Sequence, residues 1–338
     1  MYPNIYGNIL ILSSRIIKIE KKENGVGLKN PHFLKIFIRR FNLKIGIDLG
    51  GSHIAIGAID KNGQILEKSE KRLLEREKQN IKKSIEEYIF EKTEELTKKY
   101  KITEMGIAIP GTILNGVVVK SVNLGLENYP IVEKLKRKIN LPIKAQNDAK
   151  CAAMAESKYG CLKEYKRSIF LTLGTGIGGA TIIDGKLLNV GDMPGCEFGH
   201  TIIQKDGIQC NCGKKGCFER YASMKAFKNN LRKALGVDEK TRGQELLNKI
   251  REDGDNPIIK PIIDEFIEYL SIGISNLINI FEPEAIGIGG SFVYFEDVLL
   301  EKLKTNIIEN NYLFNKREKI IILPAILGND AGIIGSCQ

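Results

Sequence analysis

The chain has 338 residues, of which 43% are hydrophobic and 27% are charged, a length and balance typical of a globular enzyme with more than one domain. No apolar run approaches the roughly 18 residues that span a bilayer, which argues against a membrane-spanning protein or a membrane partner. The formal net charge is +10, but residues 1–43 carry eight Lys or Arg against two Glu. Because the rest of the chain is nearly balanced, the charge does not favour a nucleic-acid partner.

Cysteine usage indicates the compartment. The chain has seven cysteines, and three of them lie within residues 210–217. An odd count does not suit a full disulfide framework, whereas clustered thiols indicate a metal site in a reducing environment. The N-terminus also lacks the charged region and cleavage site of a secretory signal. We therefore expect a cytoplasmic protein.

The first half predicts an α/β unit that begins near residue 44. Residues 1–43 show only short β-prone pieces, and we expect a basic leader that lies outside the core or ahead of the true start. Beyond them, apolar runs predict strands and amphipathic periodicity predicts helices. In chain order these are strands over 44–48, 53–59 and a third after an Asn-Gly turn, a helix over about 75–100, strands over 105–109 and 142–145, and a helix over 149–158.

The second half again opens with a strand, a glycine turn and a strand. The predicted elements are strands over 168–173 and 180–183, an irregular loop, helices over about 222–281 with a break near 254–257, a strand over 284–288, a helix to about 310, a strand over 320–323 and a closing helix from 330. The repetition predicts a duplicated α/β architecture with a cleft between its halves. We expect lobes over 44–155 and 156–324, and a closing helix over 325–338 that returns to the first lobe.

Two glycine-rich turns are candidate phosphate sites. Glycine lets the backbone approach a phosphate closely, and Asp48, at a strand end, could hold Mg²⁺ or its water shell. An ordinary hairpin explains either turn alone, but two copies predict clamps that grip the ATP phosphates from opposite lobes. The second is neither a Walker A motif nor a dinucleotide fingerprint, since a strand follows it. The turns comprise Gly50, Gly51 and Ser52, and Gly174, Thr175, Gly176 and Gly178.

Asn147 and Asp148 end a short apolar strand and open a helix. An Asp at this place is a good helix N-cap, which is a purely structural role. It can also act as a general base that accepts the proton of an attacking hydroxyl, with Asn147 orienting the sugar. The local pattern alone leaves both interpretations open.

A cysteine and histidine cluster is the strongest chemical signal. His200 is followed by Cys210, Cys212 and Cys217. Three thiolates and one imidazole can close a tetrahedral zinc site, with no position left for a metal-bound water. We therefore expect a structural zinc ion, although buried thiols without metal remain an alternative.

Together these residues resemble the ROK family (repressors, open reading frames and kinases). The resemblance covers residues 44–338 in the family's order: Asp-x-Gly-Gly, Asn-Asp-Ala, the glycine hairpin, Glu-x-Gly-His, and Cys-x-Cys-Gly-x-x-Gly-Cys-x-Glu. It implies an α/β actin-like ATPase (ribonuclease H-like) fold with two lobes and a central cleft for ATP and sugar. It also implies a homodimeric hexose kinase that uses ATP, Mg²⁺ and structural Zn²⁺, with glucose as the favoured hexose.

The resemblance implies a role for each matching residue. Asp148 is the expected catalytic base. His200 would place one ring nitrogen on zinc and the other on a sugar hydroxyl. Gly289 and Gly290 are the expected adenosine-side turn. The expected sugar-binding residues are Asn123, Asn147, Asp148, Glu197, His200 and Glu219.

The sequence departs from the ROK family pattern at two places, and three alternatives to a glucose kinase stay open. Position 52 is Ser where the family usually has Thr, and 43 residues precede the matching region. N-acetylhexosamine kinases and fructokinases share most of the sugar-binding residues. The family's repressors carry a winged helix-turn-helix, for which residues 1–43 show no pattern. An actin- or chaperone-like ATPase would have no use for Glu197, Glu219 and the zinc loop.

Overall fold

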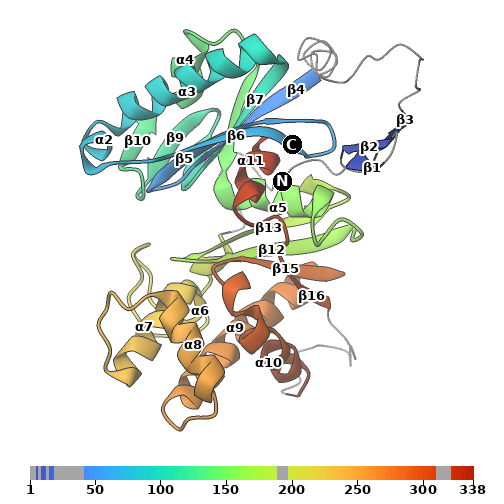
Figure 1. Ribbon diagram of the computed structural model, residues 1–338. Helices are drawn as coiled ribbons and strands as arrows, with labels where there is room; N and C mark the ends of the chain where they lie inside the picture. Colours follow the sequence, from blue (N-terminus) through green and yellow to red (C-terminus); the bar gives the residue numbers. More distant parts are fainter. Residues whose placement is uncertain (1–4, 7–8, 13–14, 19–41, 189–196, 310–320) are drawn as a thin grey trace.

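The computed structural model describes residues 5–6, 9–12, 15–18, 42–188, 197–309 and 321–338. Its first large sheet has the order β11-β7-β4-β5-β6, in which β4, β7 and β11 are parallel and β5 and β6 are antiparallel (Figure 1). The central strands are apolar along almost their whole length because helices cover both faces. The strands are β4 (Asn42–Leu49), β5 (His53–Ile59), β6 (Ile65–Arg72), β7 (Lys101–Ile109) and β11 (Ile143–Asn147).

The second large sheet has the order β14-β13-β12-β15-β16. Here too an antiparallel hairpin, β12–β13, is followed by the parallel strands β15 and β16. When the five strands of each sheet are numbered in chain order, the two sheets have the same spatial order, 5-4-1-2-3. This agrees with the predicted duplication. The strands are β12 (Arg167–Leu173), β13 (Ile177–Ile183), β14 (Lys186–Leu187), β15 (Ala285–Gly290) and β16 (Ile321–Pro324).

A smaller antiparallel sheet, β10-β9-β8, was not predicted from the sequence. Its first turn contains Asn115 and Gly116, both with positive φ (49° and 77°), which is the Asn-Gly hairpin signal. The strands are β8 (Thr112–Leu114), β9 (Val117–Ser121) and β10 (Leu126–Tyr129). In the leader, β1 (Ile5–Tyr6), β2 (Ile9–Leu12) and β3 (Arg15–Lys18) form a separate antiparallel sheet. The end of the predicted leader needs a correction, because Asn42 and Leu43 belong to β4 and Leu43 is buried in the core. The remaining leader residues lie outside the described residues.

The helices largely follow the predicted pattern, with one correction. The helix predicted over 75–100 is two helices, because Asn80 leaves the helical region (φ −120°, ψ 43°). The predicted break near 254–257 is confirmed, and Gly236 adds another in the left-handed conformation. The helices are α2 (Glu75–Gln79), α3 (Ile81–Lys99), α4 (Ile131–Lys136), α5 (Asp148–Tyr159), α6 (Glu219–Ala222), α7 (Met224–Leu235), α8 (Gly243–Asp253), α9 (Ile259–Phe281), α10 (Glu296–Glu309) and α11 (Ala331–Ser336).

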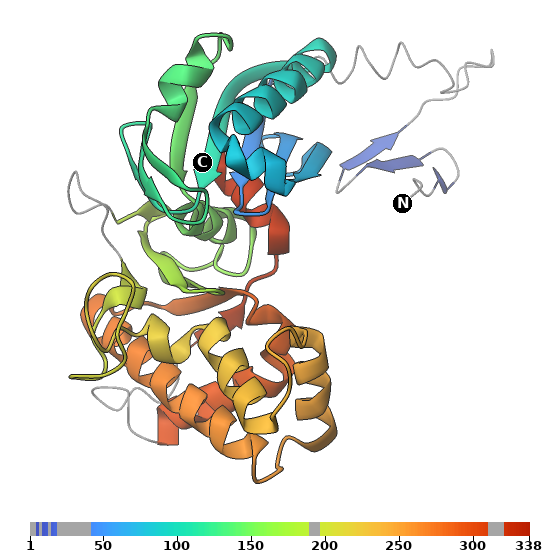
Figure 2. The same cartoon turned by 90° about the vertical axis from the view of Figure 1, so that its left-hand side faces the viewer.

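Helices α5 and α11 lie between the two large sheets (Figures 1 and 2). Helix α5 contacts strands of both sheets, and α11 packs against β4 and β7. The two helices touch backbone to backbone, because a Cβ atom at Gly335 would overlap the carbonyl oxygen of Cys151. The predicted lobe boundary at residue 155 falls inside α5, and the lobe limits stay a prediction.

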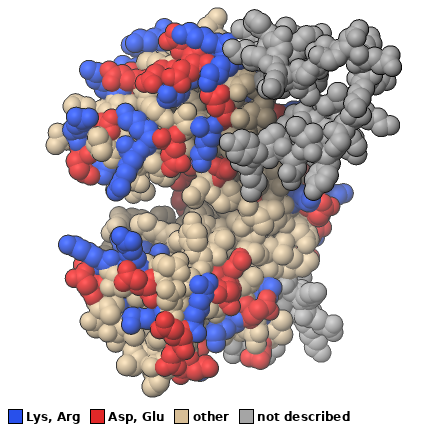
Figure 3. All heavy atoms as spheres, viewed as in Figure 1, with Lys and Arg blue, Asp and Glu red and all other residues tan. Residues whose placement is uncertain are grey.

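The surface of the described residues shows a deep notch between the two halves (Figure 3). Acidic and basic side chains are mixed on both sides of the notch, so this view shows no continuous basic face. Among the described residues, no helix combines the length and apolar character needed to cross a membrane.

Candidate active site

Asn147 and Asp148 stand where β11 passes into α5. The N-cap of α5 is Asn147, whose Oδ1 accepts a hydrogen bond from the Lys150 amide at 3.1 Å. Its Nδ2 donates to the carbonyl oxygen of Gly111 at 3.0 Å. The capping role considered for Asp148 is therefore filled by its neighbour. The Asp148 carboxylate accepts hydrogen bonds from two backbone amides at the start of α5, that of Ala149, to Oδ1 at 2.8 Å, and its own.

The surroundings of Asp148 favour the neutral form of its carboxyl. Burial raises its pKa, hydrogen bonds from the Ala149 and Asp148 amides partly oppose this, and the negative charge of the exposed Glu197 raises the pKa further. A carboxyl group whose pKa lies nearer to neutrality is better matched to proton transfer at the operating pH.

Asp48 lies at the same end of the first sheet as Asp148, with strand β7 between their two strands. In register, Asp48 pairs with Ala108 on β7, which pairs in turn with Gln146 on β11. Burial and then the charge of Asp148 raise the pKa of Asp48 to about 7, against a partial opposing effect of Lys68. Helix α11 presses on this carboxyl, because a Cβ atom at Gly332 would lie 2.6 Å from Asp48 Cγ. The sequence did not reveal this role of Gly332.

The first glycine turn lies next to a predicted sugar residue. The turn closes with a hydrogen bond from the Gly50 amide to the His53 carbonyl oxygen at 2.8 Å. A Cβ atom at Gly51 would lie 3.2 Å from the carbonyl oxygen of Asn123, which sits in the turn between β9 and β10. Ser52 is exposed beside them. The structure therefore brings the first phosphate turn and the predicted specificity segment together.

The second glycine turn lies between α5 and α7. The Gly174 amide donates to the Gly176 carbonyl oxygen, and the Lys225 amide donates to Gly174, both at 3.0 Å. Thr175 is exposed at the tip. Gly178 lies in β13 and makes room for α5, because its Cβ atom would lie 2.9 Å from that of Ala149. The second turn thus lies close to the beginning of the helix that carries Asp148.

The predicted adenosine-side turn follows β15. Gly290 pairs in register with Leu173 and has a φ of 71°, and a Cβ atom there would lie 2.5 Å from the Leu173 carbonyl oxygen. Gly289 is buried before it. Beyond the turn, Lys228 Nζ of α7 lies 3.3 Å from Ser291 Oγ. Glycine is required at position 290 by both conformation and space.

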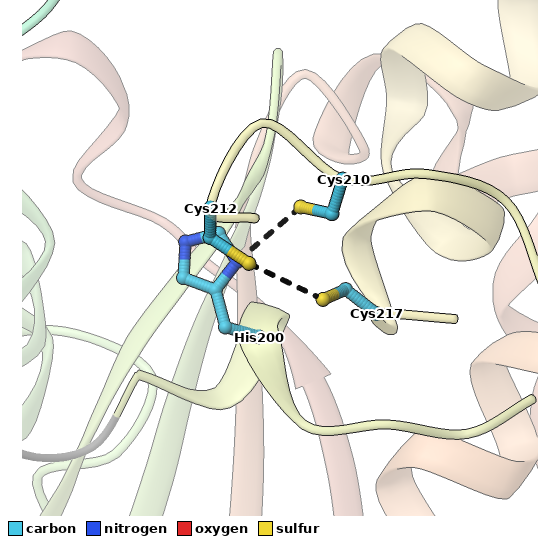
Figure 4. Close-up of side chains that lie close together, drawn as sticks. All are labelled: His200, Cys210, Cys212 and Cys217. Carbon is cyan, nitrogen blue, oxygen red and sulfur yellow. Dashed lines mark hydrogen bonds between the residues drawn. The ribbon is translucent and has the colours of Figure 1, made fainter. Parts of the chain in front are cut away.

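The four predicted metal ligands come together in space. Their ligand atoms all lie within 4.8 Å of one another, and Figure 4 shows the three sulfur atoms and the imidazole grouped around one point. Cys212 Sγ and Cys217 Sγ are 3.5 Å apart, and Cys210 Sγ is 3.7 Å from His200 Nδ1. These separations fit a tetrahedron with metal–sulfur bonds of about 2.3 Å. The donor set therefore suits a zinc ion.

Glu219 links this metal loop to the second glycine turn. Its Oε1 lies 3.7 Å from Cys210 Sγ, and its Oε2 accepts a hydrogen bond from the Ile177 amide at 3.2 Å. A Cβ atom at Gly176 would overlap Glu219 Oε2. The sequence predicted a sugar contact for Glu219 but did not indicate its contact with the turn, since 42 residues separate Glu219 from Ile177.

Comparison with known proteins decides the family. The model of the ROK family matches residues 44–338. The chain belongs to the ROK family. One ROK relative, the glucokinase of Thermotoga maritima, is 31% identical over 313 residues, which cover 87% of this chain and 96% of the relative. Another, the xylose repressor of Caldicellulosiruptor bescii, is 30% identical over 80% of this chain and 71% of its own length.

A solved ROK structure confirms the predicted fold class. The ROK glucokinase from Streptomyces griseus, solved in complex with glucose and AMPPNP, has a TM-score of 0.73 to this chain at 26% identity. The similarity covers 87% of this chain and 98% of the glucokinase. The actin-like ATPase fold expected from the sequence is therefore the fold of this ROK protein.

Proposed function

We propose that this ROK protein is an ATP-dependent hexose kinase that converts glucose to glucose 6-phosphate. The observation that carries the proposal is the position of Asp148. It stands at the start of α5, close to the second glycine turn and at the same end of the first sheet as Asp48, and Asn147 has taken over the capping role that would otherwise explain it. A buried carboxyl group at this place is suited to act as a general base.

In this proposal Asp148 accepts the proton of the attacking sugar hydroxyl. Asn147, Glu197 and Asn123 orient the sugar, and His200 and Glu219 do so from the metal loop. The raised pKa of Asp148 strengthens it as a base relative to an ordinary carboxylate. Phosphoryl transfer needs little else from the protein beyond positioning and compensation of charge.

The nucleotide would lie across the two glycine turns, with its adenosine side toward Gly289 and Gly290. Asp48 and Asp148 form a pair of neighbouring carboxyl groups, and such a pair suits a hard cation with oxygen ligands. Asp48 would hold Mg²⁺, which neutralises charge on the phosphates when it is bound.

His200, Cys210, Cys212 and Cys217 would hold a zinc ion. Four protein ligands close a tetrahedral site, so this ion fixes the shape of the loop and activates no water. The cysteines that the structure describes are all free thiols, which supports a reducing compartment and hence the cytoplasm. The homodimer implied by the family resemblance is part of the same proposal.

Two other activities within the family are kept as alternatives. Kinases for N-acetylhexosamines or fructose would use most of the same sugar-binding residues. A sugar-responsive repressor, like the xylose repressor relative, would bind the sugar without transferring phosphate. The intact constellation of Asp48, Asp148 and the two glycine turns favours a kinase over the repressor.

A hexose panel tests the proposal. ADP formation is measured with purified full-length protein, Mg·ATP and, in turn, glucose, N-acetylglucosamine, N-acetylmannosamine and fructose, with a sugar-free reaction as the control. We expect sugar-dependent turnover, highest with glucose. Turnover that is highest with an N-acetylated sugar would replace glucose but keep the kinase. Sugar binding without turnover on any member would favour the repressor.

A further inference from the structure

Glu156 is a buried carboxylate that the proposed chemistry does not use. It lies on α5, two turns after Asp148, and its side chain is fully buried. Its Oε2 accepts a hydrogen bond from the Cys161 amide at 2.9 Å. Its Oε1 accepts two more, from the amides of Ile326 at 3.0 Å and Leu327 at 2.8 Å. Three N–H donors thus converge on one side chain.

Those donors belong to the two places where the chain passes between the large sheets. The first connection, residues 160–166, leads from α5 to β12 and contains Cys161. The second, residues 325–330, leads from β16 to α11 and contains Ile326 and Leu327. The two connections are far apart in sequence. Glu156 therefore joins both connections to helix α5 through hydrogen bonds.

A glutamate at position 156 costs more free energy than an apolar side chain of similar size would. A negative charge in the last turns of a helix is opposed by the helix dipole, and a buried carboxylate must recover its hydration energy from hydrogen bonds. Gly160 supports the arrangement. Its φ of −113° is open to any residue, yet a Cβ atom there would overlap Glu156 Oε2. A Cβ atom at position 160 would also lie 2.8 Å from Glu156 Cα, so glycine is required there by close packing against both the carboxylate and the backbone of Glu156.

Helix α5 packs differently on its two sides. Ala153 belongs to a cluster with Phe170 and Ala285 of the second sheet, whereas Ala155 packs with Ala331 and Ile334 of α11. Since α11 in turn contacts β4 and β7, a rotation of one sheet against the other must take place around α5. Both connections meet α5 at the Glu156 carboxylate through hydrogen bonds, and Leu162 and Ala325 of the same connections also pack in the cluster of Ala153.

We propose that Glu156 is a positioning residue whose carboxylate is the pivot for closure of the cleft on sugar and nucleotide. The proposal rests on the kinase function proposed above. A pivot shared by both connections restricts the rotation to one path, so that the second glycine turn and the metal loop approach Asp148 in a fixed geometry. Glutamine cannot replace it fully, because its NH₂ group would face an N–H donor.

The variant test uses Glu156→Gln with Glu164→Gln as the matched control. Glu164 lies in the same first connection, but its side chain is exposed. The radius of gyration is measured by small-angle scattering with and without glucose and AMPPNP, together with kcat, both KM values and Tm. We expect Glu156→Gln to close incompletely, with KM for glucose and for ATP each raised about tenfold and kcat reduced. Glu164→Gln should behave as wild type.

A purely structural role for Glu156 would lower Tm while closure and both KM values stay as in wild type, and that result overturns the proposal. Gly160→Ala is the second variant, since a methyl group there would overlap Oε2 of the same carboxylate. It should reproduce the incomplete closure, and normal closure in a folded Gly160→Ala protein would also contradict the pivot.

A measurement on the unaltered protein removes the dependence on variants. Amide hydrogen exchange at Cys161, Ile326 and Leu327 is followed with and without AMPPNP. A pivot predicts that these amides are protected to the same degree in both states, while amides of the glycine turns change. Loss of protection on closure overturns the proposal. If no hexose is phosphorylated but AMPPNP closes the cleft around unchanged pivot amides, the proposed function fails and the pivot is supported.

Discussion

At the scale of single residues, the replacement Asp148→Asn separates structure from chemistry. Asparagine keeps the size of the side chain and can still accept the hydrogen bond from the Ala149 amide, so fold and sugar affinity should be retained. It cannot take up a proton, and we expect kcat with glucose to fall by ~10² or more. Steady-state kinetics and sugar titration of both proteins check this. A near-normal kcat would remove Asp148 from the role of base.

The titration of Asp48 should make the stability of the protein depend on pH. Its pKa in the folded chain is about 7, above the ordinary value of 3.8, because of burial and the charge of Asp148. A proton held more tightly when folded adds to the free energy of unfolding below pH 3.8, and this contribution is lost as pH rises through about 7. In Asp48→Asn the contribution is absent, so Tm should decline less across this window than in wild type. Parallel melting curves would contradict the shifted pKa.

The same titration should govern metal binding. The ionised form of Asp48 is the one that can hold Mg²⁺, so affinity for Mg·AMPPNP should weaken as pH falls below about 7. Titration calorimetry across this range measures the effect, and Asp48→Asn provides the baseline without a carboxylate. Equal pH dependence in the two proteins would assign the effect to another group.

Sequence patterns predicted the candidate metal-binding residues better than the structural roles of the residues next to the site. The cysteines and His200 were predicted as one site because their spacing is specific to metal ligands, and the structure brings them together. The cap role of Asn147 was missed, since Asn and Asp are equally good caps and only geometry separates them. The contact of Gly332 with Asp48 was also missed, because nothing local links residues 284 positions apart.

At the scale of elements, the metal loop should matter for both substrates. In Cys212→Ser the loop loses one zinc ligand, and its Glu219 reaches both the cysteine cluster and the Ile177 amide of the second glycine turn. We expect a lower Tm, a raised KM for the sugar, and a smaller rise in KM for ATP. Metal analysis of the wild type should find about one zinc per chain. A metal-free preparation with full activity would contradict the zinc site and indicate that the cysteines only pack in the core.

The closing helix offers a second element-scale test. A methyl group at position 332 would lie 2.6 Å from Asp48 Cγ, which no real contact allows. Gly332→Ala should therefore displace either α11 or the Asp48 side chain. We expect weaker binding of Mg·AMPPNP with a smaller change in sugar affinity, because the atoms nearest to the added methyl group belong to Asp48, the proposed Mg²⁺ residue, and not to an expected sugar-binding residue. Unchanged nucleotide binding would show that α11 moves away without cost to the site.

Element prediction was limited where local signals were weak or misleading. The Glu- and Lys-rich stretch over 75–100 has helical character throughout, so the break at Asn80 was hidden. The strands β8 to β10 are three to five residues long, and such short runs are ambiguous between strand and loop. Longer strands gave clearer signals: β4 was predicted from its alternation of polar and apolar residues and β12 from its apolar run.

At the scale of the whole molecule, sugar choice should depend on both halves together. Asn123 comes from the first half, whereas His200 and Glu219 come from the second. A site built to pair with hydroxyl groups discriminates against analogues that leave its polar groups unpaired. We expect kcat/KM for glucose to exceed that for N-acetylglucosamine and for fructose. The reverse order would indicate that the segment around Asn123 accommodates a larger substituent.

The duplication was predictable from the sequence, whereas the way in which the halves are joined was not. Two strand–turn–strand patterns predicted two similar sheets. The buried Glu156 drew no attention, since a Glu at helical spacing usually points to solvent. Its role depends on amides 5, 170 and 171 residues away, and such distant pairings leave no periodic signal.

The close seating of α11 has a consequence for synthesis on the ribosome. Gly46 and Gly106 leave gaps in the first sheet that the backbone of α11 fills, and Ala55 and Ile59 are covered by Ile333. All strands of this sheet have been synthesised once β11 ends at Asn147, but helix α11, which covers one face of the sheet, begins only at Ala331. Until then an apolar face stays open, at the stage when chains of this size are prone to aggregate. Translation past residue 331, and any chaperone that shields the face until then, would set the pace at which the first half matures.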